Sequence, residues 1–267
     1  MKTVVITGST RGIGFGMADA FLARGCAVMI NGRLEQGVER AVEALRRRYP
    51  DHAVYGFSGD VRDSNRVEAL WRQAEISFEK IDIWINNAGI SGPQMKTWEI
   101  SQAQAKEIVE TDLLGVIYGS QIAMKGMMKQ GFGSIYNMEG AGSDGRMHDG
   151  LIIYGMTKYG VSYFTKGLIS EAAGSPVIVG SIRPGMVITD FILEQFEGRP
   201  EAWERAKRIF NIIADRVETV APWIVDRILA NEKNGTRISR SSRSRLFFRF
   251  ITAPFRRRDL FEDESVS

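Results

Sequence analysis

The sequence has a single cysteine and no long apolar run. One cysteine in 267 residues, Cys26, cannot form a disulfide framework, and it fits a reducing intracellular compartment. No apolar run approaches the roughly 18–20 residues that a membrane-spanning helix needs. Met1-Lys2 leads directly into the apolar Val4-Val5-Ile6, so we expect no secretory signal peptide and a cytoplasmic protein.

Acidic residues are missing from one long stretch near the C-terminus. Residues 237–258 contain eight arginines and no aspartate or glutamate, although the whole chain has a net charge of only +3. Phenylalanines lie among these arginines, as in Arg245-Leu246-Phe247-Phe248-Arg249-Phe250-Ile251. Such a segment can make a peripheral contact with an anionic membrane or pack on a neighbouring subunit. Its charge alone also allows nucleic acid, but nothing else in the sequence supports that partner, and we expect none.

The rest of the sequence alternates short apolar runs with helical patterns. Its hydrophobic content of 44% and charged content of 25% are ordinary for a globular chain, and its length allows a substantial core. Strands are predicted at 4–6, 26–30, 53–57, 81–85, 134–138 and 177–182, and helices at 13–24, 34–49, 64–79, 101–128 and 154–173. Alternation of this kind, with strands that are apolar throughout, is typical of a parallel sheet covered on both faces. We therefore predict an α/β fold, a doubly wound Rossmann-type parallel sheet in one domain over 1–235, followed by a basic, aromatic C-terminal extension over 236–267.

Glycines stand where the first predicted strand turns into the first helix. The segment reads Thr7-Gly8-Ser9-Thr10-Arg11-Gly12-Ile13-Gly14, with the spacing G-x-x-x-G-x-G. Glycine at such a turn permits positive φ and the close approach of a pyrophosphate, whose charge then lies at the helix N-terminus. Because the loop directly follows an N-terminal strand, we interpret it as a nucleotide phosphate site.

A second motif, Tyr154-Gly155-Met156-Thr157-Lys158, lies in the last predicted helix. A carbonyl that receives hydride must also take up a proton, and Tyr154 is the candidate donor. Lys158 lies one helical turn away on the same side. Its positive charge is expected to lower the pKa of the phenol, which is about 10 when free. The alternative is an aromatic residue and a lysine on an ordinary amphipathic helix.

These motifs, with Asp60-Val61, Asn86-Asn87-Ala88-Gly89 and Pro184-Gly185, occur in an order that resembles the short-chain dehydrogenase/reductase family. The resemblance extends from residue 1 to about residue 230. It implies a nicotinamide cofactor whose adenine is held by 60–61, whose adenosine side is lined by 87–89 and whose carboxamide is held by 184–189. The lysine of the second motif would also hold the nicotinamide ribose. The cofactor-binding residues implied in this way are Gly8, Ser9, Thr10, Arg11, Gly12, Ile13, Gly14, Arg33, Asp60, Val61, Asn87, Ala88, Gly89, Lys158, Pro184, Gly185, Val187 and Thr189.

A carboxylate is missing at the end of the second predicted strand. An NAD enzyme needs an acidic residue there to accept from the ribose 2′-OH, but this chain has Asn31-Gly32-Arg33. A 2′-phosphate favours a guanidinium instead. We therefore predict NADPH, with Arg33 at the 2′-phosphate and Arg11 of the glycine loop as a helper. The alternative for Arg33 is a solvated surface arginine.

Two side chains that the family usually carries are missing as well. The family has Asn-x-Ser-Ser after the fifth strand, in which one serine orients the substrate carbonyl, whereas this chain has Asn137-Met138-Glu139-Gly140. The nearest hydroxyl belongs to Ser143, whose loop must be tighter than usual to reach Tyr154. The long helix has Asp112 where the family has an asparagine that supports a proton relay. Asp112 either stabilises the charged lysine, or simply accepts its hydrogen bonds, or alters the relay. The catalytic candidates are Tyr154, Lys158, Ser143 and Asp112, and no metal site is expected.

Four segments resemble one subgroup of this family, the chlorophyll(ide) b reductases. They are 81–89, 140–146, 184–190 and 208–214, and the second reads Gly140-Ala141-Gly142-Ser143-Asp144-Gly145-Arg146 in place of the usual serine motif. The subgroup reduces the 7-formyl group of chlorophyll b or chlorophyllide b to hydroxymethyl with NADPH, and the resemblance implies that reaction here. The substrate would be a large hydrophobic tetrapyrrole. Four methionines fall in segments that would border this substrate: Met138, Met147, Met156 and Met186. The alternative is that they are ordinary core residues.

The sequence leaves other functions open. The same scaffold can reduce another bulky hydrophobic aldehyde or ketone with NAD(P)H. A nucleotide-binding regulatory protein without turnover is a further alternative, which the intact Tyr154 and Lys158 argue against. The family resemblance also implies a homodimer or homotetramer built on the long helices.

Overall fold

The fold is built on one seven-stranded parallel sheet. The computed structural model describes residues 1–196, 200–240, 243–252 and 258–261. All strands are parallel and lie in the order β3-β2-β1-β4-β5-β6-β7. They are β1 (Thr3–Ile6), β2 (Ala27–Gly32), β3 (Val54–Ser58), β4 (Ile83–Asn86), β5 (Gly133–Met138), β6 (Val177–Arg183) and β7 (Arg237–Ser239). The doubly wound α/β sheet expected from the sequence is confirmed.

The seventh strand was not expected from the sequence. β7 consists of Arg-Ile-Ser, so no apolar run indicates it, and only Ile238 is buried. It pairs in parallel with the end of β6, where Ile238 lies beside Ile182. The predicted boundary between residues 235 and 236 falls just before this strand. The predicted extension therefore begins with an edge strand of the sheet.

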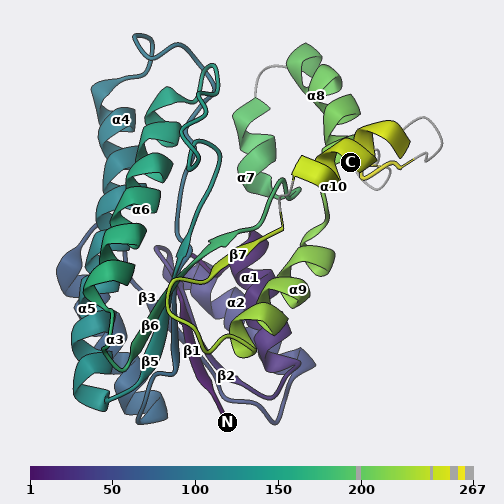
Figure 1. Ribbon diagram of the computed structural model, residues 1–267. Helices are drawn as coiled ribbons and strands as arrows, with labels where there is room; N and C mark the ends of the chain where they lie inside the picture. The colour runs from purple at the N-terminus through teal and green to yellow at the C-terminus, as the bar shows by residue number, and fades with distance from the viewer. Residues whose placement is uncertain (197–199, 241–242, 253–257, 262–267) are drawn as a thin grey trace.

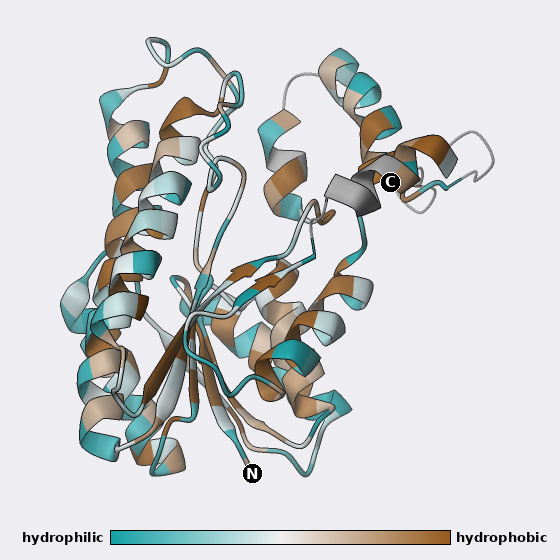
Figure 2. Cartoon of the chain, in the orientation of Figure 1, coloured by the Kyte–Doolittle hydropathy of each residue, from teal (hydrophilic) through white to brown (hydrophobic). Residues whose placement is uncertain are grey.

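Helices cover both faces of the sheet (Figure 1). One face carries α1 (Gly12–Leu22), α2 (Glu35–Arg48) and α9 (Val217–Leu229); the other carries α3 (Ser64–Phe78), α4 (Gln102–Val109), α5 (Gly115–Gln130) and α6 (Ile152–Glu171). Each face has its own apolar core, one containing Phe21 and Ile30 and the other Trp71 and Trp84. Figure 2 shows the strands as an apolar layer between helices with hydrophilic outer faces. Burial on both sides explains why the strands are apolar along their length.

A π turn separates α4 from α5 within one continuous helical stretch. α4 begins with a capping box in which Ser101 and Gln104 exchange hydrogen bonds. The π turn covers Glu110–Leu114 and places the Asp112 side chain in the interior. Such turns insert an extra residue into a helix and are frequent at functional sites. The stretch that the sequence predicted as one or two helices is thus interrupted at Asp112.

A small helical lobe lies beyond the carboxyl ends of the strands, at the upper right of Figure 1. It contains α7 (Asp190–Leu193), a 3-10 turn (Glu194–Phe196), α8 (Pro200–Ile213) and α10 (Arg243–Thr252). Its core is aromatic, since the rings of Phe196, Trp203, Phe210 and Phe261 contact one another with centroids 5.0 to 6.0 Å apart. Phe261 belongs to the C-terminal extension, which therefore helps to build the lobe.

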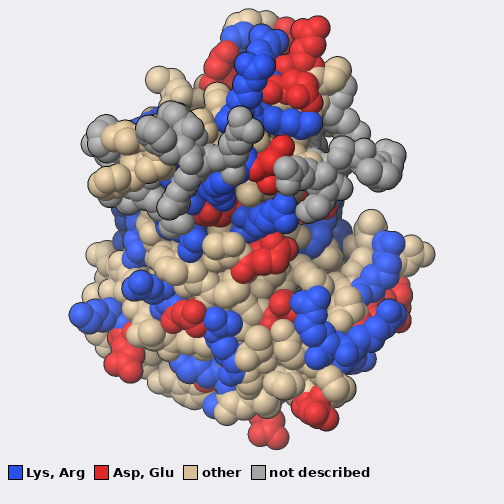
Figure 3. All heavy atoms as spheres, turned by 90° about the vertical axis from the view of Figure 1, so that its right-hand side faces the viewer, with Lys and Arg blue, Asp and Glu red and all other residues tan. Residues whose placement is uncertain are grey.

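The carboxylate of Asp215 ties the extension to the domain. It lies 3.2 Å from Arg240 Nε, 2.6 Å from Arg249 Nη2 and 3.7 Å from Arg258 Nη2. These three arginines of the basic stretch thus pair with a buried carboxylate. Figure 3 shows basic and acidic side chains interspersed on the face that carries the lobe. Within the described ranges, no helix has both the length and the hydropathy that crossing a membrane requires.

Replacing Asp215 with alanine is expected to destabilise the protein by about 3 kcal/mol, because three guanidiniums lose the carboxylate that balances them. Urea unfolding followed by circular dichroism measures the loss. The matched control is Asp226→Ala, since Asp226 pairs with Arg24 at 2.6 Å but is 62% exposed. Exposed pairs contribute about 1 kcal/mol or less. Equal losses in the two variants would contradict a special role for the Asp215 cluster.

Candidate active site

The glycine loop and the start of α1 form a cradle for phosphate. Gly8 has a φ of +60°, and a Cβ there would lie 2.7 Å from the Cα of Ala88. A Cβ at Gly14 would lie 2.5 Å from the Gly8 carbonyl oxygen. α1 begins at Gly12 without a side-chain cap, so its first N–H groups can bind an anion. Glycine is thus required for close backbone packing, and the loop fits the pyrophosphate of a dinucleotide.

Asn87 and Thr7 join the glycine loop to the end of β4. Thr7 Oγ1 accepts from the N–H groups of Asn87 and Ala88 at 3.0 and 3.1 Å. The Asn87 amide donates to the carbonyl oxygens of Thr7 and Gly8, at 2.9 Å each. The side chain of Asn87, predicted to line the adenosine side, therefore holds the loop in place.

Three further residues of the glycine loop pack against the strands and the core beneath α1. The buried Ser9 hydroxyl accepts from the Asn31 N–H at 3.0 Å and donates to the last carbonyl of β1 at 2.6 Å. Thr10 packs on the end of β2, where a Cβ at Gly32 would lie 2.5 Å from Thr10 Cγ2. Ile13 packs against the apolar core beneath α1. These side chains thus fix the conformation of the loop whose backbone meets the phosphates.

The segment 184–189, which was predicted to hold the nicotinamide carboxamide, lies against the glycine loop at Thr189. A Cβ at Gly12 would lie 3.5 Å from Thr189 Cγ2. Beside it, Arg11 Nη1 lies 3.6 Å from Asp190 Oδ2. Arg11, predicted to help at the 2′-phosphate, lies here beside the start of α7 with its side chain 62% exposed.

The same segment is anchored by backbone pairing. Pro184 is buried, and Gly185 has a φ of +86°, which glycine adopts without strain. Val187 forms an isolated parallel bridge with Asp215. Asp215, whose carboxylate holds the C-terminal extension, is therefore paired through its backbone with the predicted carboxamide site.

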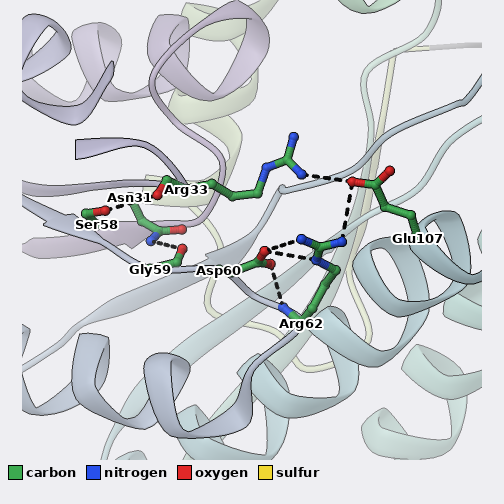
Figure 4. Close-up of polar contacts among 7 residues, drawn as sticks. All are labelled: Asn31, Arg33, Ser58, Gly59, Asp60, Arg62 and Glu107. Atoms are coloured by element: carbon green, nitrogen blue, oxygen red, sulfur yellow. Dashed lines mark hydrogen bonds and ion pairs between the residues drawn. The ribbon is translucent and has the colours of Figure 1, made fainter. Parts of the chain in front are cut away.

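At the predicted adenosine end, Arg33 and Asp60 both have protein partners (Figure 4). Arg33 Nη1 lies 2.9 Å from Glu107 Oε1 of α4. Asp60 Oδ2 accepts from Arg62 Nη2 and Nε at 2.6 and 2.9 Å. Burial would raise the pKa of Asp60, but the hydrogen bonds and charge of Arg62 outweigh it and lower this pKa. Val61 is buried in the core under α3 and α5. The sequence argument identified neither Arg62 nor Glu107.

Asp112 and Lys158 form a buried ion pair at the centre of the site. Asp112 Oδ2 lies 2.9 Å from Lys158 Nζ, and the side chains are 0% and 4% exposed. Asp112 Oδ1 accepts from the Ile90 N–H at 2.7 Å. Gly89 lies against the pair, since a Cβ there would be 3.2 Å from Lys158 Nζ. Burial raises the pKa of Asp112, and the lysine and the Ile90 N–H oppose this. Asp112 therefore balances the lysine charge directly.

Tyr154 is held as a neutral phenol. Burial raises its pKa, and the negative charge of Asp112 raises it further. Lys158 Nζ lies 5.5 Å from the centroid of the Tyr154 ring. The expectation that Lys158 lowers this pKa is wrong for the structure, because the tyrosine is buried and the lysine charge is balanced by a carboxylate. A protonated phenol suits proton donation to a reduced carbonyl.

Gly140 stands where the family has its second serine, and the tyrosine takes up that space. A Cβ at Gly140 would lie only 2.2 Å from the Tyr154 hydroxyl oxygen. Ser143 is buried, and its hydroxyl accepts from the Gly140 N–H at 3.0 Å. The Ser143 hydroxyl thus approaches the position of the missing serine from three residues further along the chain.

The loop that carries Ser143 is held tightly against α6. A Cβ at Gly142 would lie 2.5 Å from the Cα of Gly155, the residue after the tyrosine. The buried Glu139 accepts from Arg237 of β7, with Oε2 and Nη2 2.5 Å apart. The tight loop expected from the short spacing is present, and the unexpected β7 supplies one of its anchors.

Phe191 of α7 is a neighbour of the tyrosine that the sequence did not indicate. Its ring centroid lies 5.9 Å from that of Tyr154. The four methionines expected around the substrate differ in their surroundings. Met138 is buried in the main core, and Met186 packs with the aromatic lobe. Met147 and Met156 are exposed.

The comparisons with known proteins agree with this geometry. The family model described as short chain dehydrogenase matches residues 2–199. The chain therefore belongs to the short-chain dehydrogenase/reductase family. It is an oxidoreductase that acts on a carbonyl/alcohol pair with NAD(P)H.

Two curated relatives and one solved structure illustrate the range of similarity. Chlorophyll(ide) b reductase NOL of Arabidopsis thaliana is 35% identical over 254 residues, covering 93% of this chain and 70% of that protein. The 3alpha-hydroxysteroid dehydrogenase of Mediterraneibacter gnavus is 32% identical over 191 residues, covering 72% of this chain and 76% of that protein. The crystal structure of levodione reductase has a TM-score of 0.82 at 25% identity, covering 91% of this chain and 97% of that chain.

Asp112→Asn is expected to lower the pKa of Tyr154, because the amide removes a negative charge and leaves the lysine charge uncompensated. Reduction needs the phenol, and oxidation of the alcohol needs the phenolate. The pH at which reduction declines and the pH at which oxidation rises should therefore both move down, by about one unit. The measurement is kcat against pH in both directions.

The control for this variant is Glu110→Gln on the same π turn. Glu110 lies 3.6 Å from Lys106 and its side chain is 31% exposed, so its charge is screened by solvent. Its pH profiles should match those of the wild type. Unmoved profiles in Asp112→Asn would contradict the coupling of Asp112 to the tyrosine.

Proposed function

We propose that this protein reduces the 7-formyl group of chlorophyll b or chlorophyllide b to a 7-hydroxymethyl group with NADPH. One observation carries the substrate assignment: how far each similarity extends along the chain. The match to the Arabidopsis chlorophyll(ide) b reductase covers 93% of this chain, whereas the match to the hydroxysteroid dehydrogenase covers 72%. The longer match leaves out only 7% of 267 residues, about 19, so it includes the lobe over residues 190–213, where substrate contacts in an α/β enzyme of this kind are expected.

The chemistry assigned to the residues follows from their positions. Bound NADPH supplies hydride to the formyl carbon. Tyr154 donates its proton to the formyl oxygen as charge develops there. Ser143 hydrogen-bonds the same oxygen and orients it, in the role that the family gives to its serine. Lys158, balanced by Asp112, holds the nicotinamide ribose.

The choice of NADPH rests on charge at the end of β2. The chain has Asn31-Gly32-Arg33 there and no carboxylate. The Asn31 amide donates to the carbonyl oxygens of Phe57 and Gly59, at 3.2 and 3.0 Å, so it is used within the protein. The Arg33 side chain is 53% exposed, and its guanidinium can bind a phosphate.

A second candidate is reduction of another bulky hydrophobic aldehyde or ketone. The similarity to a 3alpha-hydroxysteroid dehydrogenase favours a large alicyclic substrate for this alternative. The same tyrosine and the same cofactor would serve, so only the substrate distinguishes the two candidates.

The deciding experiment incubates the purified protein with NADPH and chlorophyll b or chlorophyllide b. Loss of the formyl group shifts the red absorption band, and chromatography separates the 7-hydroxymethyl product. Tyr154→Phe is expected to lower kcat by a factor of about 100 or more, because it removes the proton donor. It should leave the affinity for NADPH nearly unchanged. If the wild type binds NADPH and reduces a ketosteroid but no chlorophyll derivative, the second candidate replaces the first.

Two further partners are proposed from exposed apolar side chains. Met156, Tyr159 and Tyr163 of α6 are 54%, 56% and 79% exposed and lie on one face of the helix. We assign this face to a second copy of the chain, in a homodimer or homotetramer. Phe248 and Phe250 of α10 are 64% and 53% exposed. These two side chains suit peripheral contact with a lipid surface, where a chlorophyll substrate is dissolved.

Replacing Phe248 and Phe250 with serine is expected to reduce binding to liposomes that contain anionic lipid, because apolar area no longer enters the interface. The bound fraction after sedimentation is the measurement. Trp98→Ser is the control, since Trp98 is 82% exposed but lies in the loop before α4. An unchanged bound fraction in the double variant would exclude α10 as the membrane contact.

A further inference from the structure

Two guanidiniums converge on one carboxylate oxygen at the proposed adenosine end. Glu107 Oε1 lies 2.9 Å from Arg33 Nη1 and 3.4 Å from Arg62 Nη1. Arg33 follows β2, Arg62 follows β3, and Glu107 comes from α4 (Figure 4). Three separate elements thus bring the two guanidiniums and the Glu107 carboxylate to the same place, and a second carboxylate, that of Asp60, pairs with Arg62 there.

Arg62 is oriented before any ligand reaches it. Asp60 Oδ2 accepts from its Nη2 and Nε, and Asp60 Oδ1 accepts from its backbone N–H at 3.0 Å. The fork that binds Asp60 leaves Nη1 directed at Glu107. The Arg62 and Asp60 side chains are 32% and 27% exposed, so the pair lies at the surface within reach of a ligand.

The backbone beneath the two arginines is fixed as well. Ser58 Oγ donates to the carbonyl oxygen of Arg33 at 3.1 Å, and Gly59 N–H donates to the carbonyl of Gly32 at 2.9 Å. The ends of β2 and β3 are therefore bound to each other. The guanidiniums extend from a rigid edge, and Glu107 reaches them from a helix.

From this geometry we propose that Arg62 is a second arginine for the cofactor 2′-phosphate and that Glu107 is a built-in competitor for the same two guanidiniums. The proposal rests on the assignment of NADPH made above. A phosphate monoester carries a charge of about −1.5 to −2 and three acceptor oxygens, so it can bind Arg33 and the Nη1 of Arg62 more strongly than one carboxylate can. Glu107, whose side chain is 39% exposed, can turn into solvent when it is displaced.

The competitor has a consequence for discrimination between cofactors. A ribose 2′-hydroxyl carries no charge and cannot replace a carboxylate between two arginines. With NADH the Glu107 side chain stays on Arg33 and Arg62, and the two arginines add nothing to the binding free energy of the cofactor. Glu107 therefore lowers the affinity for NADPH, which must displace it, while NADH binds with the carboxylate in place. The preference for NADPH is thus smaller than the two arginines alone would give.

The test is titration calorimetry with adenosine 2′,5′-bisphosphate and with 5′-AMP, which differ only in the 2′-phosphate. The wild type should bind the bisphosphate more tightly. Arg62→Ala should weaken bisphosphate binding about tenfold and 5′-AMP binding little, and Arg62→Lys should restore part of the loss. Glu107→Gln should tighten bisphosphate binding several-fold.

Matched controls come from the exposed pair on α3. Arg72 Nη2 lies 2.5 Å from Glu68 Oε1, and the side chains are 69% and 51% exposed. Arg72→Ala and Glu68→Gln change the net charge equally and should leave both affinities as in the wild type. Thermal unfolding of all four variants shows whether each is folded.

The outcomes separate this inference from the proposed function. Equal wild-type affinities for the two nucleotides would overturn the assignment of NADPH. Another outcome is a wild type that prefers the bisphosphate while folded Arg62→Ala and Arg62→Lys variants bind it as well as Arg72→Ala does. That result would keep the assignment of NADPH and overturn the role of Arg62. Weaker bisphosphate binding in Glu107→Gln would show that Glu107 positions the arginines, and would overturn its role as a competitor.

Discussion

The buried pair of Asp112 and Lys158 is the interaction on which the arrangement of the site depends. A charge removed from water needs a partner and further hydrogen bonds, and each of these ions has the other at 2.9 Å. The π turn exists where Asp112 must point inward, and Gly89 is small where the pair must fit. The negative charge also reaches Tyr154, whose proton it retains. One pair thus connects the shape of a helix, the size of a loop residue and the protonation of the catalytic phenol.

Much of the fold could be predicted because it depends on local patterns. Apolar runs marked six strands, and the glycines and the Tyr154–Lys158 spacing marked the phosphate and nicotinamide parts of the proposed cofactor site. β7 could not be predicted from its own three residues. Its place depends on pairing with β6 and on the bond from Arg237 to Glu139, a residue 98 positions away. Contacts of such separation leave no periodicity in the sequence.

The electrostatics of the site were the least predictable part. The spacing of Tyr154 and Lys158 correctly indicated that they share a helix face, but the sign of the pKa shift depends on burial and on Asp112, 42 positions before the tyrosine. Likewise, Arg33 was recognised at the end of β2, whereas its partner Glu107 lies 74 positions away. In both cases the residue type was informative, and the charge around it was set by a distant element.

The contact between Gly140 and the tyrosine also limits how such a site can evolve. The space that a serine side chain would need already contains the hydroxyl of Tyr154. A return to the usual serine by one substitution would push the tyrosine away from its position, while Ser143 would still hold the backbone N–H of residue 140. A serine at position 140 can therefore coexist with Tyr154 in its present position only if the loop changes as well. The two arrangements are alternatives separated by an unfavourable intermediate, which helps to explain how a distinct loop sequence can persist once it has arisen.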